Sequence, residues 1–208
     1  MSSRSKPQPL RTRLKEEARA AILDAAEQVM AEQGLTATRM EDIAARVGVS
    51  VGTLYNYFED RRQLLQALLE QQAQQLLGQL DAELERGQGE PYRARLHGVL
   101  RIILEHTARH FRFFTFLVQE DARRPDEQRQ SHQRVWSEAS ARLERLGAEG
   151  IAQGELRADD AAHYPTLLLG MVQSLLWRQL LEHRPLPVEE QLALLLRCFL
   201  AGASPRPT

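Results

Sequence analysis

Residues 48–58 read GVSVGTLYNYF and lie between two segments with clear helical periodicity. By propensity this stretch is a poor helix, because glycine, β-branched residues and tyrosine are weak helix formers. The segment that follows, DRRQLLQALLEQQAQQLL (60–77), is rich in strong helix formers. We infer that the side chains of 51–57 were selected for the surface that they present rather than for helix stability.

The residues before this stretch predict two helices. Apolar residues at helical spacing indicate a first helix over 13–33, which Gly34 ends. Thr38 and Glu41 match a capping box and predict a short second helix that stops before Gly48. Glycine can adopt the left-handed conformation of a sharp turn. Two short helices joined at a glycine are typical of a helix-turn-helix.

The stretch itself supplies the second helix of that motif. Ser50 is a suitable N-cap, and Leu54 and Phe58 are the apolar residues expected to anchor the helix to the core. A recognition helix enters the major groove with its N-terminus first, so its first turn has to be slim. Val51 and the methyl group of Thr53 are suited to contact thymine methyl groups. The alternative is a plain helical hairpin within a core.

The remainder of the chain shows helical periodicity and almost no strand signal. The sequence therefore predicts an all-α protein of about nine helices, with a three-helix helix-turn-helix domain followed by a larger helical domain. We expect a disordered basic arm over 1–12, the helix-turn-helix domain over 13–60 and the larger domain over 61–203. The later helices are expected at about 60–86, 91–109, 111–121, 125–152, 159–183 and 187–201.

Charge and composition limit the possible functions. The chain has 208 residues and a formal net charge of −1, so its overall charge gives no reason to expect a nucleic-acid partner. Residues 1–20, however, contain six basic and two acidic side chains. Such an arm could bind phosphate, although basic termini are commonly just solvated.

Three features predict a soluble, cytoplasmic protein. The single cysteine, Cys198, lies in the apolar run LALLLRCFL and is expected to be a buried thiol in a reducing compartment. No apolar stretch approaches the roughly 20 residues that span a bilayer. The first 18 residues lack the apolar region of a signal peptide. We therefore expect no membrane association.

The last two predicted helices are apolar on more than one face, as a helix buried on two sides should be. One side would meet the core, and we expect the other to meet a second copy, giving a homodimer through a four-helix interface. The alternative is a larger core. The residues concerned are Leu167, Leu168, Leu169, Met171, Val172, Leu175, Leu176, Leu180 and Leu181, with Leu192, Leu194, Leu195, Leu196, Phe199 and Leu200.

Aromatic residues gather in the predicted fifth to eighth helices and favour an apolar site for a small apolar or aromatic ligand. Any one of them could equally be a core residue. His106 and His110 are spaced for a shared metal, but no third ligand lies at convincing spacing, so neither a metal nor a cofactor is predicted. Arg178 is a further polar candidate. The expected ligand-binding residues are His106, Phe113, Phe114, Leu117, Trp136, Tyr164, Gln173 and Trp177.

The stretch ILDAAEQVMAEQGLTATRMEDIAARVGVSVGTLYNYFEDRRQLLQALLE, within residues 18–70, resembles the DNA-binding domain of the tetracycline-repressor (TetR) family of bacterial transcriptional regulators. The segment GELRADDAAHYPTLLLGMVQSLLW (154–177) resembles the family's ligand-binding and dimerisation domain more weakly. The resemblance implies a homodimer, a palindromic double-stranded DNA operator, and release from it by a small ligand.

The family's DNA contacts in its GTLY element correspond to Thr53 and Tyr55 here, and its next aromatic position to Tyr57. Where the family usually has a phosphate-binding lysine, this chain has Arg61, which keeps the charge but adds a planar fork of donors. The residues expected to contact DNA are Thr38, Arg39, Ser50, Val51, Gly52, Thr53, Tyr55, Asn56, Tyr57 and Arg61.

These observations and the resemblance predict a homodimeric, sequence-specific DNA-binding transcriptional regulator, and the favoured interpretation is a repressor released by a small-molecule ligand bound in the C-terminal helical domain. An enzyme is not expected, because no nucleophile–base pair, cofactor loop or metal set stands at usable spacing. A helical adaptor, or a small-molecule-binding protein that does not bind DNA, remains the alternative.

Overall fold

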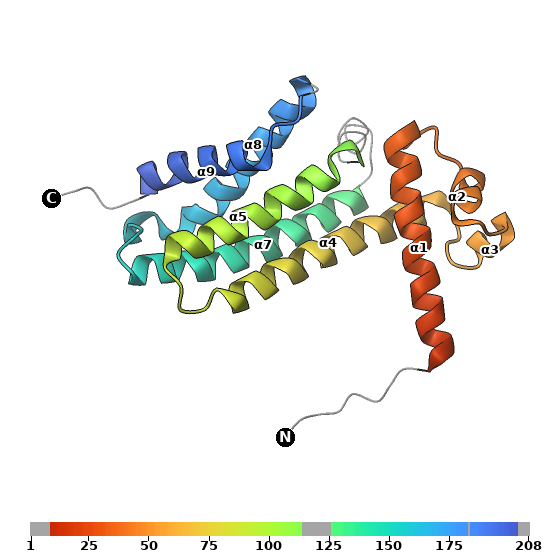
Figure 1. Ribbon diagram of the computed structural model, residues 1–208, viewed down its shortest axis with the longest axis horizontal. Helices are drawn as coiled ribbons and strands as arrows, with labels where there is room; N and C mark the ends of the chain where they lie inside the picture. Colours follow the sequence, from red (N-terminus) through yellow and green to blue (C-terminus); the bar gives the residue numbers. More distant parts are fainter. Residues whose placement is uncertain (1–8, 114–125, 183, 204–208) are drawn as a thin grey trace. The chain divides into compact units, whose positions relative to one another are not determined.

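The computed structural model describes residues 9–113, 126–182 and 184–203, and within these ranges it is helical with no strand. The expected all-α class is thereby confirmed (Figure 1). The helix expected over 111–121 lies almost entirely outside the described residues. The elements are α1 (Leu10–Gln33), α2 (Met40–Val47), α3 (Val51–Tyr55), α4 (Arg61–Arg86), α5 (Tyr92–Arg109), α7 (Asp126–Ala152), the 3₁₀ helix η1 (Ala158–His163), α8 (Tyr164–Glu182) and α9 (Val188–Ala203).

The described residues form two compact units, and α4 contributes to both. The first unit contains residues 9–71, and the second contains 72–113 together with 126–203. The division falls within α4, after Gln71.

The first unit packs α2, α3 and the beginning of α4 against the C-terminal half of α1. The turn between α2 and α3 is made by Gly48, which has a φ of 81° and donates its N–H to the carbonyl of Ala44 at 3.0 Å. The fourth helix begins as expected, because the carboxylate of Asp60 accepts the N–H of Gln63 at 2.7 Å. The buried side chains at the centre of this unit are Ile22, Leu23, Ala26, Val29, Met30, Leu35, Ile43, Ala44, Leu54, Phe58, Leu64 and Leu68.

The capping box expected from Thr38 and Glu41 is wrong. The second helix begins at Met40, so the acidic residue that reaches back is Asp42, whose carboxylate accepts the N–H of Arg39 at 3.2 Å. The hydroxyl of Thr38 donates instead to the carbonyl of Gly34 at 2.8 Å.

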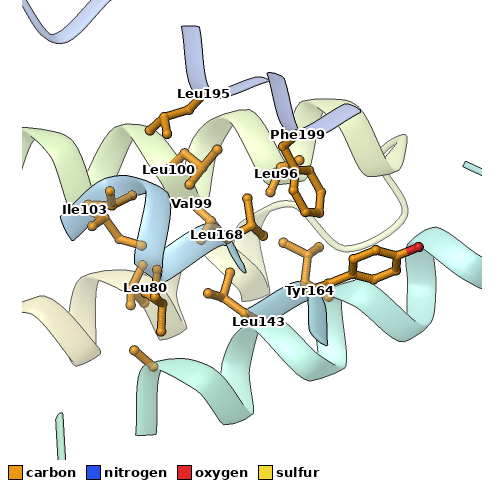
Figure 2. Close-up of a cluster of buried hydrophobic side chains, with 14 of the residues drawn as sticks. Leu80, Leu96, Val99, Leu100, Ile103, Leu143, Tyr164, Leu168, Leu195 and Phe199 are labelled. Carbon is orange, nitrogen blue, oxygen red and sulfur yellow. The ribbon is translucent and has the colours of Figure 1, made fainter. Parts of the chain in front are cut away.

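The second unit is held together by one cluster of buried side chains from α4, α5, α7, α8 and α9 (Figure 2). Leu100 and Leu96 of α5 are completely buried in it. The ring of Tyr164 packs edge-on against that of Phe199, with ring centroids 5.6 Å apart. Its hydroxyl donates to the carbonyl of Arg157 at 2.7 Å, which satisfies the polar end of this buried side chain.

Two buried glutamines fix the connection between α8 and α9. Gln179 donates its side-chain amide to the side-chain oxygen of Gln191 at 3.0 Å, and its own oxygen accepts the N–H of Leu186 at 2.8 Å. Gln191 in turn donates to the carbonyl of Leu186 at 2.8 Å. Because the buried polar groups satisfy one another, the two apolar helices are held in one arrangement.

Cys198 is exposed on α9, so the expected burial of this thiol is wrong. Leu195 and Phe199 of the same helix face the core, and Cys198 lies about 90° away from that direction around the helix. None of the described helices has the length and apolarity needed to cross a bilayer.

Gly150, in the last turn of α7, lies against the ring of Tyr92. A Cβ at Gly150 would come within 2.8 Å of two ring carbons of Tyr92 and 3.0 Å of a methyl carbon of Leu156. Since the ring is fully buried, it has little room to move. We predict that Gly150→Ala lowers the free energy of unfolding by about 1–3 kcal/mol, measured by urea denaturation.

Gly147→Ala is the matched control, because Gly147 lies one turn earlier in α7 and an added Cβ would meet nothing within 4 Å. The greater helix propensity of alanine should leave that variant as stable as the wild type or more stable, by up to about 1 kcal/mol. Equal destabilisation by both substitutions would contradict the close packing of Gly150 on Tyr92.

Candidate nucleic-acid interface

The short helix α3 is fixed by a cap at its start and two buried side chains further along. Ser50 is its N-cap, and its hydroxyl oxygen accepts the N–H of Thr53 at 3.1 Å. The hydroxyls of Ser50 and Thr53 also form a hydrogen bond, at 2.8 Å. Leu54 is completely buried and Phe58 is 2% exposed, as the sequence predicted for the anchors of this helix. The helix is therefore held with one defined face outward.

That outer face is slim near the start of α3 and aromatic further on. Gly52, Tyr55 and Asn56 are exposed, while Val51, Thr53 and Tyr57 are partly exposed. The structure thus brings six of the predicted DNA-contacting residues to the surface of one helix and its end. Asn56 is the C-cap residue, with helical dihedral angles, so its side chain continues the same surface.

Gly52 has no role in the packing of the described residues. A Cβ at this position would meet only the hydroxyl oxygen of Ser50, at 3.9 Å, which is an ordinary contact. Its φ is not positive, so the backbone does not require glycine either. Since alanine would stabilise the helix, the missing side chain is best explained by close approach of something outside the subunit.

Two of the residues predicted to contact DNA, Thr38 and Arg61, form hydrogen bonds within the first unit. Thr38 is 2% exposed, and its hydroxyl already donates to Gly34, so its side chain is not presented at the surface. One guanidinium nitrogen of Arg61 donates to the carbonyls of Thr36 and Thr38, at 3.0 and 3.1 Å. Arg39 is exposed beside them. The sequence could not reveal the role of Arg61, because carbonyl partners leave no signature in side-chain identity.

Arg46 of α2 joins this helix to α1 through its guanidinium group. Its guanidinium donates to both carboxylate oxygens of Glu32, one at 2.5 Å and the other at 3.2 Å, and to the side-chain oxygen of Gln28 at 3.3 Å. The hydrogen bond and charge of Glu32 raise the pKa of Arg46. This arginine holds α2 on α1 and is not part of the outer face of α3.

The predicted ligand-binding residues that the structure describes are divided between the interior of the second unit and the exposed surface of α8. His106 and Phe113 are buried, and Tyr164 is buried in the hydrophobic cluster described above. Trp136 is partly buried against the same cluster. Gln173 and Trp177 are exposed on α8, and so is Arg178, which pairs with Glu182. Phe114 and Leu117 lie outside the described residues.

The rings of His106 and His110 lie close together, with centroids 4.7 Å apart. Burial, followed by the nearby charges of His110 and Arg109, lowers the pKa of His106 to about 4. His106 is therefore neutral near pH 7. Within the described residues, no three histidine, cysteine or acidic side chains are grouped as metal ligands would be.

An exposed apolar stripe runs along α8. Leu167 is 52% exposed, Trp177 45% and Leu181 74%. Gly170 and Ser174 lie on the same helical face, so the stripe (167, 170, 174, 177, 181) follows the alternating three- and four-residue spacing of a helix–helix seam. The inner side of α8 is separately buried in the core cluster. The sequence predicted apolar residues on two sides of this helix but not the small residues within the seam.

Comparison with known families gives two matches. Residues 22–68 match the family described as "Bacterial regulatory proteins, tetR family". Residues 89–177 match "Tetracyclin repressor-like, C-terminal domain". The two matches belong to the same kind of protein and together cover more than half of the chain.

Individual relatives match over part of the chain. The chain is 43% identical over 61 residues to the HTH-type transcriptional regulator TtgR of Pseudomonas putida, covering 28% of this chain and 29% of that protein. It is 34% identical over 76 residues to the HTH-type regulator YvkB of Bacillus subtilis, covering 36% of this chain and 38% of that protein. The chain thus matches only about a third of the length of these curated relatives.

Solved structures match over nearly the whole chain. The regulatory protein TetR from Rhodobacter sphaeroides is 27% identical with a TM-score of 0.73, covering 89% of this chain and 98% of its own. The fatty acid degradation regulator FadR from Bacillus halodurans has a TM-score of 0.76 at 18% identity, covering 95% and 98%. The helix-turn-helix geometry and both family matches agree. The chain belongs to the TetR family of bacterial transcriptional regulators.

Proposed function

We propose that this protein is a homodimeric, sequence-specific DNA-binding regulator that reads its operator with the outer face of α3. The observation that carries this proposal is Gly52, an exposed glycine in the first turn of α3 that neither packing nor backbone conformation requires. A helix that enters the major groove with its N-terminus first needs such a slim first turn.

Each exposed residue of α3 then has a chemical role in the groove. Val51 and the methyl group of Thr53 contact thymine methyl groups, and the amide of Asn56 suits the edge of adenine. The hydroxyl of Thr53 is hydrogen-bonded to the hydroxyl of Ser50 at 2.8 Å, which limits the rotation of this side chain. Tyr55, 48% exposed, offers its hydroxyl to a phosphate oxygen without a long flexible stem.

The exposed stripe of α8 supports the homodimer. Three large apolar side chains, each about half exposed or more, stand along one face of a helix whose other side is already buried in its own core. A symmetry-related copy of the same seam would cover them, with Gly170 and Ser174 allowing close approach. Such a dimer would present two recognition helices about 34–36 Å apart, which fits a palindromic operator.

For regulation we propose a small apolar or aromatic ligand in the second unit. His106 is buried there and neutral near pH 7, so it could orient a polar group of the ligand without carrying charge. α4 contributes residues to both units. A ligand that favours one packing of α4 would alter the spacing of the two recognition helices and release the operator. The regulator FadR from Bacillus subtilis, whose structure contains stearoyl-CoA, shares the fold at 20% identity, with a TM-score of 0.74.

Thr53→Ala tests the reading role of α3. It removes the methyl group that faces the bases, and we predict that specific affinity falls by about 1 kcal/mol or more while affinity for unrelated duplex changes little. The measurement is a gel shift or anisotropy titration with the DNA that flanks the protein's own gene. Tyr55→Phe serves as the comparison, because loss of a phosphate contact should weaken both DNAs alike. Equal losses on both DNAs for Thr53→Ala would contradict its proposed place next to the bases.

Leu181→Glu tests the dimer. A charge within an apolar seam has to be desolvated in each copy, so we predict that this variant sediments as a monomer at micromolar concentration while the wild type sediments as a dimer. Leu14→Glu is the matched control, because Leu14 is 56% exposed on α1, which belongs to the other unit. A wild-type protein that is monomeric under the same conditions would refute the interface.

A further inference from the structure

The first three turns of α1 extend beyond the packed part of the first unit. The helix begins at Leu10, but its first buried residue is Ile22. At 1.5 Å per residue, about 18 Å of helix therefore precedes the first core contact. Figure 1 shows these turns continuing past α2 and α3. A short helix without tertiary packing is only marginally stable in water, so this overhang calls for an explanation.

The overhang carries a basic stripe on a defined face. Arg11, Lys15 and Arg19 are each four residues apart and exposed, and they lie within about 80° of arc around the helix. The same arc continues into the buried residues Ile22, Ala26 and Val29. The stripe of Arg11, Lys15 and Arg19 is thus the extension of the face that packs on the rest of the helix-turn-helix, beyond the point where packing stops.

The position of the last member of the stripe ties it to the recognition helix. The guanidinium of Arg19 lies over the ring of Phe58, 5.2 Å from its centroid, and Phe58 anchors the end of α3. Within the described residues, the side chains of Arg11 and Lys15 form no ion pair and no hydrogen bond. Arg13, on the opposite face, instead pairs with Glu17 at 4.0 Å.

We propose that the basic stripe on α1 binds the phosphate backbone of the same duplex that α3 reads. The inference rests on the proposed function, and charge complementarity selects the partner: three positive charges spaced over about two turns of one helical face match a line of phosphates. The contact adds affinity and orientation without reading sequence. It also explains why α1 remains helical before Ile22, where none of its described residues is buried.

The test compares two arginines that stand two residues apart. Arg11→Gln removes a charge from the stripe, and Arg13→Gln removes the same charge from the opposite face. For each variant and the wild type, operator affinity is measured by anisotropy from about 50 to 200 mM salt. Each phosphate contact that is lost should make the slope of log K against log salt shallower by about 0.9. Thermal unfolding checks that both variants remain folded.

The expected result is a shallower slope and a several-fold loss of affinity for Arg11→Gln, with a slope close to wild type for Arg13→Gln. Lys15→Gln should repeat the behaviour of Arg11→Gln. Equal changes for Arg11→Gln and Arg13→Gln would show a general effect of net charge and overturn the face-specific contact. An unchanged slope for Arg11→Gln and Lys15→Gln would overturn it as well. If the wild type binds no duplex at all, the proposed function itself fails, which is a different outcome.

Discussion

The burial of Leu54 and Phe58 is the constraint on which the rest of the first unit depends. α3 has only five residues and weak intrinsic helix propensity, so it would not form in isolation. Its conformation is imposed by these two anchors, by the cap from Ser50 and by the left-handed turn at Gly48. Because the anchors leave no rotational freedom, the outer face of α3 can consist of residues that contribute little to stability.

The two surfaces that the proposed function needs differ in chemistry, as the different partners proposed for them require. The outer face of α3 combines a missing side chain, small methyl groups and hydroxyls, which suits the floor of a DNA groove. The exposed side of α8 presents Leu167, Trp177 and Leu181, which suits another apolar helix. The inner side of α8 is fixed by the cluster around Leu168 and by the glutamine pair that joins it to α9. Each surface is thus presented by a helix whose opposite side is firmly held.

Periodicity and turn residues predicted the helices, and the boundaries fell within a few residues, because a repeating apolar pattern integrates over many positions. Single positions were harder. Glu41 and Asp42 are both acidic residues near a helix start, and only the backbone decides which of them reaches back to cap it. Cys198 lies in a run that is apolar all round, so sequence alone does not say which side faces the core. Tyr164 and Trp177 looked alike as aromatic residues, yet one is buried and the other exposed.

The central claim is that the outer face of α3 lies against bases in the major groove. The most direct measurement uses the duplex that the protein protects in a footprinting experiment and removes its major-groove groups one at a time. Uracil replaces thymine, 7-deaza analogues replace purines, and the affinity of the unmodified protein is recorded for each duplex. The account predicts a few positions in each half-site where the loss of one methyl group or one N7 weakens binding several-fold. Binding that ignores every such substitution, or that responds only to changes in the minor groove, would contradict it.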